Sequence, residues 1–212
     1  MIIGQLSMPS KSNELNVLLD LDRTLFNTSL FDEERWKLLA RLYPEVIDLE
    51  AEQARRTKFY VYRGKLYFYD FSAHMKDLEL DVERVYRQIA DSHLADGRLE
   101  HQGVLRLINF LRGLGQVQVL TFGAEDYQSL KISLCPSLRN VKSIITDQEK
   151  GVFFRSHSHL PGEVWMIDDK PIDNLPASVN FIQASMDGLE IKEQDWPVID
   201  DLMKIPQIIG ER

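Results

Sequence analysis

The sequence predicts an α/β protein whose core is a parallel β-sheet, with a mainly helical segment inserted after the first strand. Short apolar runs alternate with stretches of helical periodicity, a pattern typical of parallel sheets with right-handed crossovers. Two of these runs end in paired aspartates, at residues 20–22 and 168–169. The roughly seventy helical and aromatic residues between the first two predicted strands are too many for a simple crossover, which indicates an insertion.

Size and composition limit the class of protein. The 212 residues, 44% of them hydrophobic, can bury the core of one domain with or without an insertion. The formal net charge of −8 argues against a nucleic-acid partner, so an anionic substrate must be met locally by a metal or a few cations. Cys135 is the only cysteine, which excludes an intramolecular disulfide. No apolar run is long enough to span a membrane and residues 1–11 lack a signal-peptide pattern, so we expect a soluble, cytoplasmic protein without a membrane partner.

The first predicted strand is the apolar run that begins at residue 16 and ends at Asp20. Residues i and i+2 of a strand point to the same side, so Asp20 and Asp22 should emerge together at its carboxyl end, the usual ligand crevice of a parallel sheet. Two adjacent carboxylates repel each other unless a cation holds both charges, and Mg²⁺ suits such oxygen ligands. With the metal bound, Asp20 can attack a phosphorus atom while Asp22 exchanges a proton with the leaving oxygen and with water. The Thr24 hydroxyl is expected to hold the turn and to orient Asp20.

Residues 29–99 form the predicted insertion, which leaves residues 1–28 and 100–212 for the core. A capping-box pattern at residues 29–32 predicts a helix that ends at Pro44, and a second helix is predicted from Pro44 to about Lys58. Residues 59–71 contain seven aromatic side chains around Arg63 and Gly64, which predicts a hairpin or an irregular aromatic layer. Such density indicates packing more often than substrate contact. A further helix is predicted from Asp81.

The rest of the chain alternates between helices and strands. A helix is predicted from about Glu100 to Gly113, then a strand over residues 116–123 and its helix over residues 124–134. Three more strands are predicted over residues 141–146, 164–167 and 180–183. None of the later intervals between strands is long enough for a second insertion.

The segment that contains Asp20, Asp22 and Thr24 resembles the first motif of the haloacid dehalogenase-like (HAD) hydrolase superfamily, a hydrophobic strand followed by DxDx[TS]. The resemblance implies a Rossmann-like core with an inserted cap, a Mg²⁺ requirement, a phospho-aspartate at Asp20 and a general acid/base role for Asp22. Arg23 stands where many members have Gly, which predicts a reshaped turn but does not argue against catalysis.

Two further motifs of that superfamily have counterparts here. Thr121 lies at the strand end of the second motif, where its hydroxyl and the backbone N–H groups of Phe122 and Gly123 can bind a phosphate oxygen. Lys150 follows the next strand and matches the lysine of the third motif, which holds the charges of the nucleophile and the phosphoryl group. Lys131 and Lys142 are the alternatives, and Lys131 is expected on a solvated helix face.

The fourth motif of the superfamily is matched by the second acidic pair. An apolar strand ends in Asp168 and Asp169. The resemblance implies that Asp169 binds the metal directly, and that Asp168 contacts the direct ligands or a metal-bound water. Asp173 is expected to orient Lys150 or a water, with helix capping as the alternative. The implied metal site therefore comprises Asp20, Asp22, Asp168 and Asp169.

These residues together predict a Mg²⁺-dependent phosphatase that hydrolyses a small phosphorylated metabolite through phospho-Asp20. A phosphotransferase of the same fold is one alternative, and a non-catalytic binding or regulatory module is another. A dehalogenase is disfavoured because Asp22 provides a proton-transfer group that suits the leaving oxygen of a phosphoester. The sequence predicts neither the identity of the metabolite nor an oligomeric state.

Overall fold

The computed structural model describes residues 15–157, 162–186 and 195–210, so residues 1–14 of the predicted core lie outside the described part. Its centre is a six-stranded sheet in the order β5-β4-β1-β6-β7-β8, and every neighbouring pair is parallel. The strands are β1 (Leu15–Leu19), β4 (Gly115–Phe122), β5 (Lys142–Thr146), β6 (Glu163–Asp168), β7 (Val179–Ala184) and β8 (Val198–Ile199). The predicted α/β fold with a parallel sheet is therefore confirmed.

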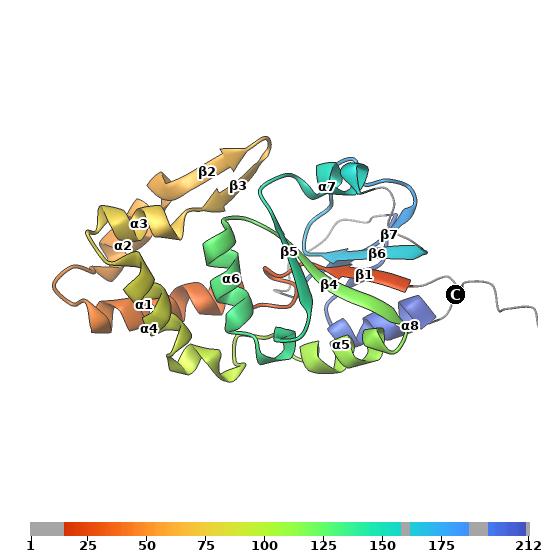
Figure 1. Ribbon diagram of the computed structural model, residues 1–212, viewed down its shortest axis with the longest axis horizontal. Coiled ribbons are helices and arrows are strands. Elements are labelled where there is room, and N and C mark those ends of the chain that lie inside the picture. Colours follow the sequence, from red (N-terminus) through yellow and green to blue (C-terminus); the bar gives the residue numbers. More distant parts are fainter. Residues whose placement is uncertain (1–14, 158–161, 187–194, 211–212) are drawn as a thin grey trace, which may run out of the picture.

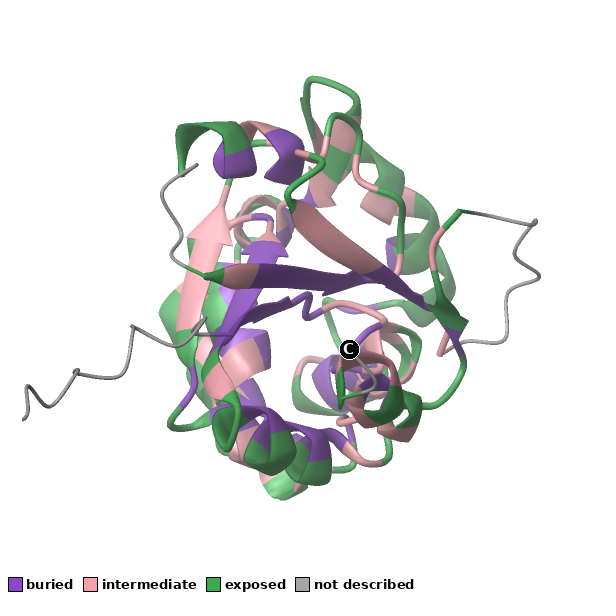
Figure 2. Cartoon of the chain, turned by 90° about the vertical axis from the view of Figure 1, so that its right-hand side faces the viewer, coloured by how far each residue is buried: buried purple, intermediate pink, exposed green. Residues whose placement is uncertain are grey.

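Helices cover both faces of this sheet (Figure 1). One face carries α5 (Val104–Arg112) and α8 (Ile205–Gly210), and the other carries α7 (Lys150–Ser156). Alternation along β1 explains the two layers: Val17 and Leu19 pack in the core that includes α5, while Leu18 packs with phenylalanines of α7. The central strands are consequently buried along their length (Figure 2), as the apolar runs predict.

The helix-rich segment, residues 28–99, lies at one end of the molecule, and α8 lies toward the other end (Figure 1). It contains α1 (Thr28–Leu42), α2 (Leu49–Arg55), a 3₁₀ turn (Arg56–Phe59), α3 (Phe71–Asp77), α4 (Val82–Ala90) and a second 3₁₀ turn (His93–Asp96). The aromatic stretch forms an antiparallel hairpin of β2 (Tyr60–Arg63) and β3 (Leu66–Tyr69), which turns at Gly64 with φ +60°. Helix α6 (Glu125–Ser133) lies between this segment and the sheet.

Several predicted boundaries are wrong for local reasons. Helix α1 begins one residue before the capping-box pattern, because the side chain of Asn27 accepts a hydrogen bond from the N–H of Leu30 at 2.9 Å. The second helix begins at Leu49 instead of Pro44, because Asp48 caps it in the same way, and it gives way to a 3₁₀ turn from Arg56. Helix α5 begins four residues later than predicted, and the short elements α3, α7, α8 and β8 were not predicted at all.

Two expectations from composition can be compared with the described part of the chain. No helix in residues 15–157, 162–186 or 195–210 has the length and apolarity needed to cross a membrane. Cys135 is a buried free thiol, and burial raises its pKa, which fits a packing role.

Candidate active site

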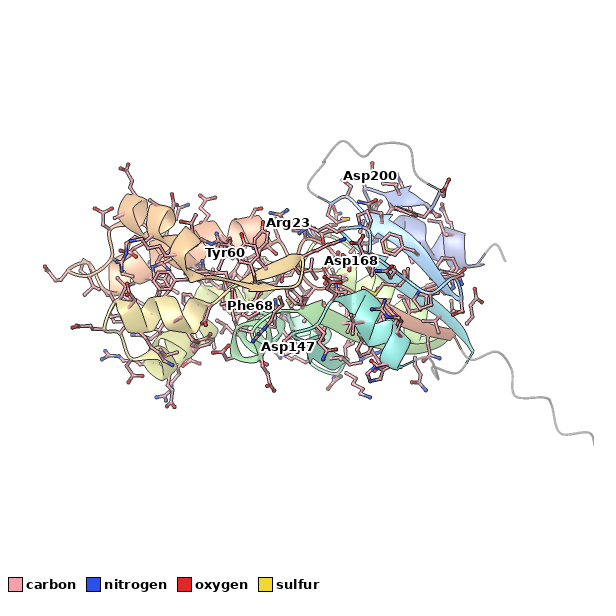
Figure 3. The ribbon with its side chains drawn as sticks, turned by 90° about the horizontal axis from the view of Figure 1, so that it is seen from above. Arg23, Tyr60, Phe68, Asp147, Asp168 and Asp200 are labelled. Carbon is pink, nitrogen blue, oxygen red and sulfur yellow. The ribbon has the colours of Figure 1, made fainter. Side chains whose placement is uncertain are left out.

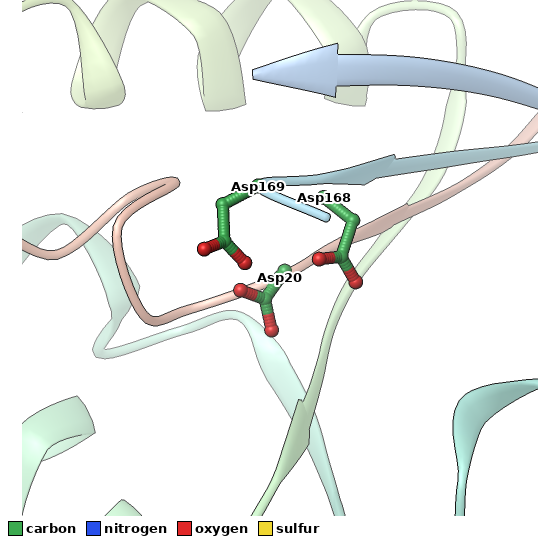
Figure 4. A group of neighbouring side chains, drawn as sticks. All are labelled: Asp20, Asp168 and Asp169. Carbon is green, nitrogen blue, oxygen red and sulfur yellow. The ribbon is translucent and has the colours of Figure 1, made fainter. Parts of the chain in front are cut away.

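The two acidic strand ends meet at the carboxyl edge of the sheet. Strands β1 and β6 are parallel neighbours, and the N–H of Asp20 donates to the carbonyl of Ile167 at 2.8 Å, which brings Asp20 beside Asp168 and Asp169. Each of the three aspartates offers a carboxylate oxygen, and these oxygens all lie within 4.8 Å of one another (Figure 4). We call these three residues the acidic cluster. Oxygen donors gathered at this spacing suit a hard divalent cation.

A buried lysine bridges the acidic cluster. The Nζ atom of Lys150 donates to Oδ1 of Asp20 and to Oδ2 of Asp168, each at 2.5 Å. Burial alone would lower the pKa of Lys150, but the charges of Asp168 and Asp20 outweigh burial and raise it, so the ammonium is retained. Lys150 is the first residue of α7, so the start of this helix brings the ammonium to the acidic cluster.

The three carboxylates of the acidic cluster repel one another, and the single charge of Lys150 balances only part of their charge. Burial raises the pKa of Asp20 well above its usual range, and the charges of Asp168 and Asp169 add to this effect against the opposing charge of Lys150. Burial and the charge of Asp168 raise the pKa of Asp169 to about 7. A divalent cation between the three carboxylates would favour the ionised forms, so the electrostatics fit a metal site.

Asp22, also predicted to hold the metal, lies outside the acidic cluster, because its carboxylate is not among the three gathered there. Its carboxylate accepts hydrogen bonds from the Thr28 hydroxyl at 2.6 Å, from Gln128 Nε2 at 3.0 Å and from Lys131 Nζ at 2.8 and 3.0 Å. Burial acts to raise the pKa of Asp22, but the charge and hydrogen bonds of Lys131, with those of Thr28 and Gln128, lower it. A cationic side chain, instead of a shared metal, therefore compensates the second carboxylate.

The position of Lys131 differs from the predicted solvated helix face. Its side chain extends from α6 and is only 5% exposed, and its ammonium lies 4.5 Å from the centre of the Tyr127 ring. Lys142, the other alternative for the third motif, is exposed on β5. The three lysines thus have different contacts: Lys150 contacts Asp20, Lys131 contacts Asp22, and Lys142 faces solvent.

The turn after β1 agrees only in part with expectation. Arg23 adopts a left-handed conformation with φ +60°, and its N–H donates to the carbonyl of Phe26 at 2.8 Å, so a tight turn forms although glycine is replaced. The Thr24 hydroxyl is buried and has no hydrogen-bond partner among the described residues. It does not hold the turn through a hydrogen bond, which corrects the role predicted for it.

At the predicted phosphate-binding strand end, the three residues have different roles. The Thr121 hydroxyl is buried, lines the cavity beside the acidic cluster and lacks a partner among the described residues, so it can donate to a bound oxyanion. Phe122 lines the same cavity. The N–H of Gly123 already donates to the carbonyl of Thr146 at 3.0 Å, so the prediction that it binds phosphate is wrong.

Asp173 does not contact Lys150 and is 61% exposed, which corrects its predicted supporting role. Its carboxylate accepts from Lys65 Nζ at 3.0 Å, and Lys65 lies at the tip of the β2–β3 hairpin. The backbone N–H of Lys65 also donates to Glu149 at 3.2 Å. Asp173 therefore joins the hairpin to the sheet edge instead of orienting Lys150.

The acidic cluster opens into a cavity of about 480 Å³ that extends to the helix-rich segment. Figure 3 shows Tyr60 and Phe68 of the hairpin between the outer helices and Asp168. Sequence reasoning missed the partners of Asp22 and the distant cavity wall, which includes Asp32 and Arg56. Gln128 and Lys131 are three residues apart and share one face of α6, but their spacing carries no sign that this face meets Asp22.

Comparisons with known proteins identify the fold. Neither protein-family models nor curated protein sequences match this chain. Among solved structures, a haloacid dehalogenase-like hydrolase from Burkholderia xenovorans aligns with a TM-score of 0.69 and 15% identity over 94% of this chain and 98% of its own. A HAD hydrolase from Bacillus subtilis bound to magnesium aligns with a TM-score of 0.60 and 14% identity over 93% of this chain and 99% of its own. A HAD phosphatase from Thermococcus onnurineus aligns with a TM-score of 0.62 and 18% identity over 92% of this chain and 97% of its own. The chain therefore has the fold of the haloacid dehalogenase-like hydrolases, as its sequence motifs predict.

Proposed function

We propose that this protein is a Mg²⁺-dependent phosphatase that hydrolyses a small phosphomonoester through a phospho-aspartate at Asp20. The observation that carries the proposal is the contact of Lys150 with both Asp20 and Asp168, inside a three-carboxylate cluster and beside the unpartnered hydroxyl of Thr121. Such a set combines a nucleophile, a charge-balancing lysine, a cation site and an oxyanion donor, as phosphoryl transfer requires. Solved proteins of this fold include a magnesium-bound hydrolase and a phosphatase, which supports the same reaction class.

The proposed reaction has two steps. A carboxylate oxygen of Asp20 forms a bond to phosphorus as the bond from phosphorus to the leaving oxygen breaks. The leaving oxygen takes a proton from Asp22 in its protonated form, which the contact with Lys131 makes the minor one. Water then attacks phospho-Asp20, Asp22 accepts a proton from the water, and inorganic phosphate leaves with Asp20 regenerated. Lys150 holds Asp20 in place, and Thr121 donates to a phosphoryl oxygen. A magnesium ion held by Asp20, Asp168 and Asp169 would supply charge stabilisation for the phosphoryl group.

The decisive test is the substitution Asp20→Asn, which keeps the shape of the side chain but removes the nucleophile. We expect phosphate release from a generic aryl phosphate to fall by about a thousand-fold or more. Rapid quenching with a ³²P-labelled substrate should label the wild-type chain covalently and leave Asp20→Asn unlabelled. The matched control is Asp200→Asn, an exposed aspartate that pairs with Lys204.

Full activity in Asp20→Asn would reject this mechanism. Product analysis also separates hydrolysis from group transfer, because a phosphotransferase would place the labelled phosphate on an added alcohol instead of releasing it. Metal-dependent binding without turnover would support a non-catalytic module.

A further inference from the structure

The wall of the cavity opposite the acidic cluster is built by the helix-rich segment. It includes Asp32 of α1, Arg56 of the 3₁₀ turn, and Tyr60 and Tyr69 of the hairpin. The cavity volume of about 480 Å³ falls within the range of small-molecule sites, of the order of 300–1,000 Å³, and exceeds the space that a phosphate alone would fill. The opposite wall is therefore available to the part of the substrate that leaves.

The positive and negative charges at this wall do not balance. The Nη2 atom of Arg35 lies 3.0 Å from Oδ1 of Asp32, and Nη1 of Arg56 lies 2.6 Å from Oδ2 of the same carboxylate. Two guanidinium groups thus share one carboxylate. The buried acid Glu52 is engaged elsewhere, by Arg55 at 2.8 Å and by His74 at 2.7 Å.

The two arginines are not equivalent. Arg35 is fully buried and its guanidinium lies 4.9 to 5.5 Å from the centres of five aromatic rings, so it neutralises Asp32 within the protein core. Arg56 lines the cavity, and its side chain is 26% exposed. Its guanidinium is held 4.8 Å from the ring of Tyr69 and 5.7 Å from that of Tyr60. Arg56 therefore contributes a positive charge in a fixed orientation that Asp32 alone does not neutralise.

We propose that Arg56 binds a second anionic group of the substrate, so that the preferred phosphomonoester carries a carboxylate or a similar anion on its leaving group. This inference rests on the proposed phosphatase function and specifies its substrate class. Guanidinium groups bind carboxylates through paired, charge-assisted hydrogen bonds. The aromatic side chains between the two ends of the cavity would contact the body of the leaving group.

The charge distribution also sets the direction of binding. The reacting end of the cavity contains Asp20, Asp168 and Asp169, which repel a free carboxylate, whereas the phosphoryl group is met there by Lys150 and the metal. The second anion is attracted to the arginine at the opposite wall. In a protein with a formal net charge of −8, such local compensation is what recognition of a doubly anionic substrate requires.

The test uses pairs of aryl phosphates that differ only in charge. Each pair has a carboxylate or its neutral carboxamide at the 3-position, at the 4-position, or on a methylene at the 4-position of phenyl phosphate. We expect wild-type kcat/KM for at least one carboxylate to exceed that of its carboxamide by about ten-fold or more, the effect of one charge-assisted contact. Arg56→Gln should remove this preference for the carboxylate, and Arg56→Lys should retain part of it. Lys58→Gln removes an exposed charge from the same turn and should leave the preference unchanged.

The outcomes separate the two proposals. Hydrolysis of all the esters without a preference for carboxylate, or a preference that survives in Arg56→Gln, overturns the role of Arg56 and leaves the phosphatase proposal standing. Absence of hydrolysis of every ester overturns the phosphatase proposal and this inference with it. If Arg56→Gln does not fold, as judged by its thermal melt, an unchanged ratio in Arg56→Lys overturns the inference.

Discussion

At the scale of single residues, the contact between Lys131 and Asp22 determines how the proposed acid/base group is held. Lys131 donates to both oxygens of the carboxylate, and Thr28 and Gln128 complete its hydrogen bonds. A side chain with partners from α1 and α6 has little freedom to rotate, so its orientation toward the cavity is set before substrate arrives. Lys131 is therefore a positioning residue for the proposed reaction.

The substitution Lys131→Met tests this role. We expect kcat to fall by about ten- to a hundred-fold, because general acid/base catalysis contributes at least that much and depends on geometry. KM should change less than kcat, and Lys131→Arg should restore part of the rate, which a purely structural role would not predict. Lys142→Met, which removes an exposed lysine from β5, is the matched control. An unchanged kcat in Lys131→Met would contradict the role.

A second buried polar contact lies in the helix-rich segment and includes Tyr69 of the cavity wall. His74 is fully buried between Glu52 at 2.7 Å and the Tyr69 hydroxyl at 2.5 Å, and its ring stacks on Phe59 with 4.2 Å between the ring centres. The neutral tautomer with a proton on Nε2 satisfies both contacts, because it donates to the carboxylate and accepts from the hydroxyl. Burial lowers the pKa of His74, against the opposing effect of Glu52.

This lowered pKa predicts a pH dependence of stability. In the unfolded chain this histidine binds a proton at about pH 6.5, whereas in the folded chain it stays neutral to a lower pH. The free energy of unfolding should therefore fall as the pH drops below about 6.5, by at most about 1.4 kcal/mol per pH unit from this group. Urea unfolding at pH 7.5 and pH 5.5 measures the difference. The substitution His74→Gln should make the difference smaller, whereas His93→Gln, at a half-exposed histidine, should not. An equal pH dependence in wild type and His74→Gln would refute the assignment.

At the scale of elements, helix α7 is positioned by a close backbone approach. A Cβ atom on Gly151 would lie 2.1 Å from the carbonyl oxygen of Asp173, so the start of α7 can approach the loop after β6 only because residue 151 has no side chain. The preceding residue is Lys150. The packing of this helix therefore sets the position of the lysine at the acidic cluster.

We expect Gly151→Ala to displace the start of α7 and thereby to move Lys150 away from Asp20. Phosphatase activity should fall at least ten-fold, and overpacking should cost about 1–3 kcal/mol of stability. Gly210→Ala provides the control, because it is also a helical glycine and a Cβ atom there has nothing within 4 Å. Gly151→Ala should therefore lower activity and melting temperature. Gly210→Ala should keep wild-type activity and should not lower the melting temperature, since alanine favours a helix where it has space. Wild-type activity in Gly151→Ala would show that the lysine does not depend on this approach.

At the scale of the whole molecule, a metal bound at the acidic cluster would couple metal binding to folding. Three carboxylates that come together only in the folded chain repel one another, so folding without a metal is opposed by their charges. A cation that binds the folded chain alone stabilises it by mass action. Stability and metal concentration should therefore be coupled.

Millimolar Mg²⁺ should raise the melting temperature relative to a chelator, by about 2–4 °C for each kcal/mol of binding free energy gained. In chelator, Asp169→Asn should melt above the wild type because one repelling charge is gone, and its response to Mg²⁺ should be lost or greatly reduced. Asp173→Asn, in the same loop but outside the acidic cluster, should respond like the wild type. A melting temperature that is insensitive to Mg²⁺ in the wild type would argue against the metal site.

The parallel sheet can be predicted from the sequence alone, because apolar runs of strand length alternate with helical periodicity. The same pattern predicts that Asp20, Asp168 and Asp169 follow strands whose carboxyl ends share one edge. It also placed Lys150 after the strand that follows Thr121. Those features depend on local periodicity and on the rule that parallel strands end together.

The contacts of the other side chains depend on the tertiary structure and cannot be predicted from the sequence. The pairing of Lys131 with Asp22, the use of the Gly123 N–H by Thr146, the exposure of Asp173 and the placement of Arg56 opposite the acidic cluster all join segments from separate elements. Their partners are set by how α6, the hairpin and α1 pack against the sheet. No residue spacing within one segment encodes a contact of that kind, because its energy depends on burial and on charges contributed by distant parts of the chain.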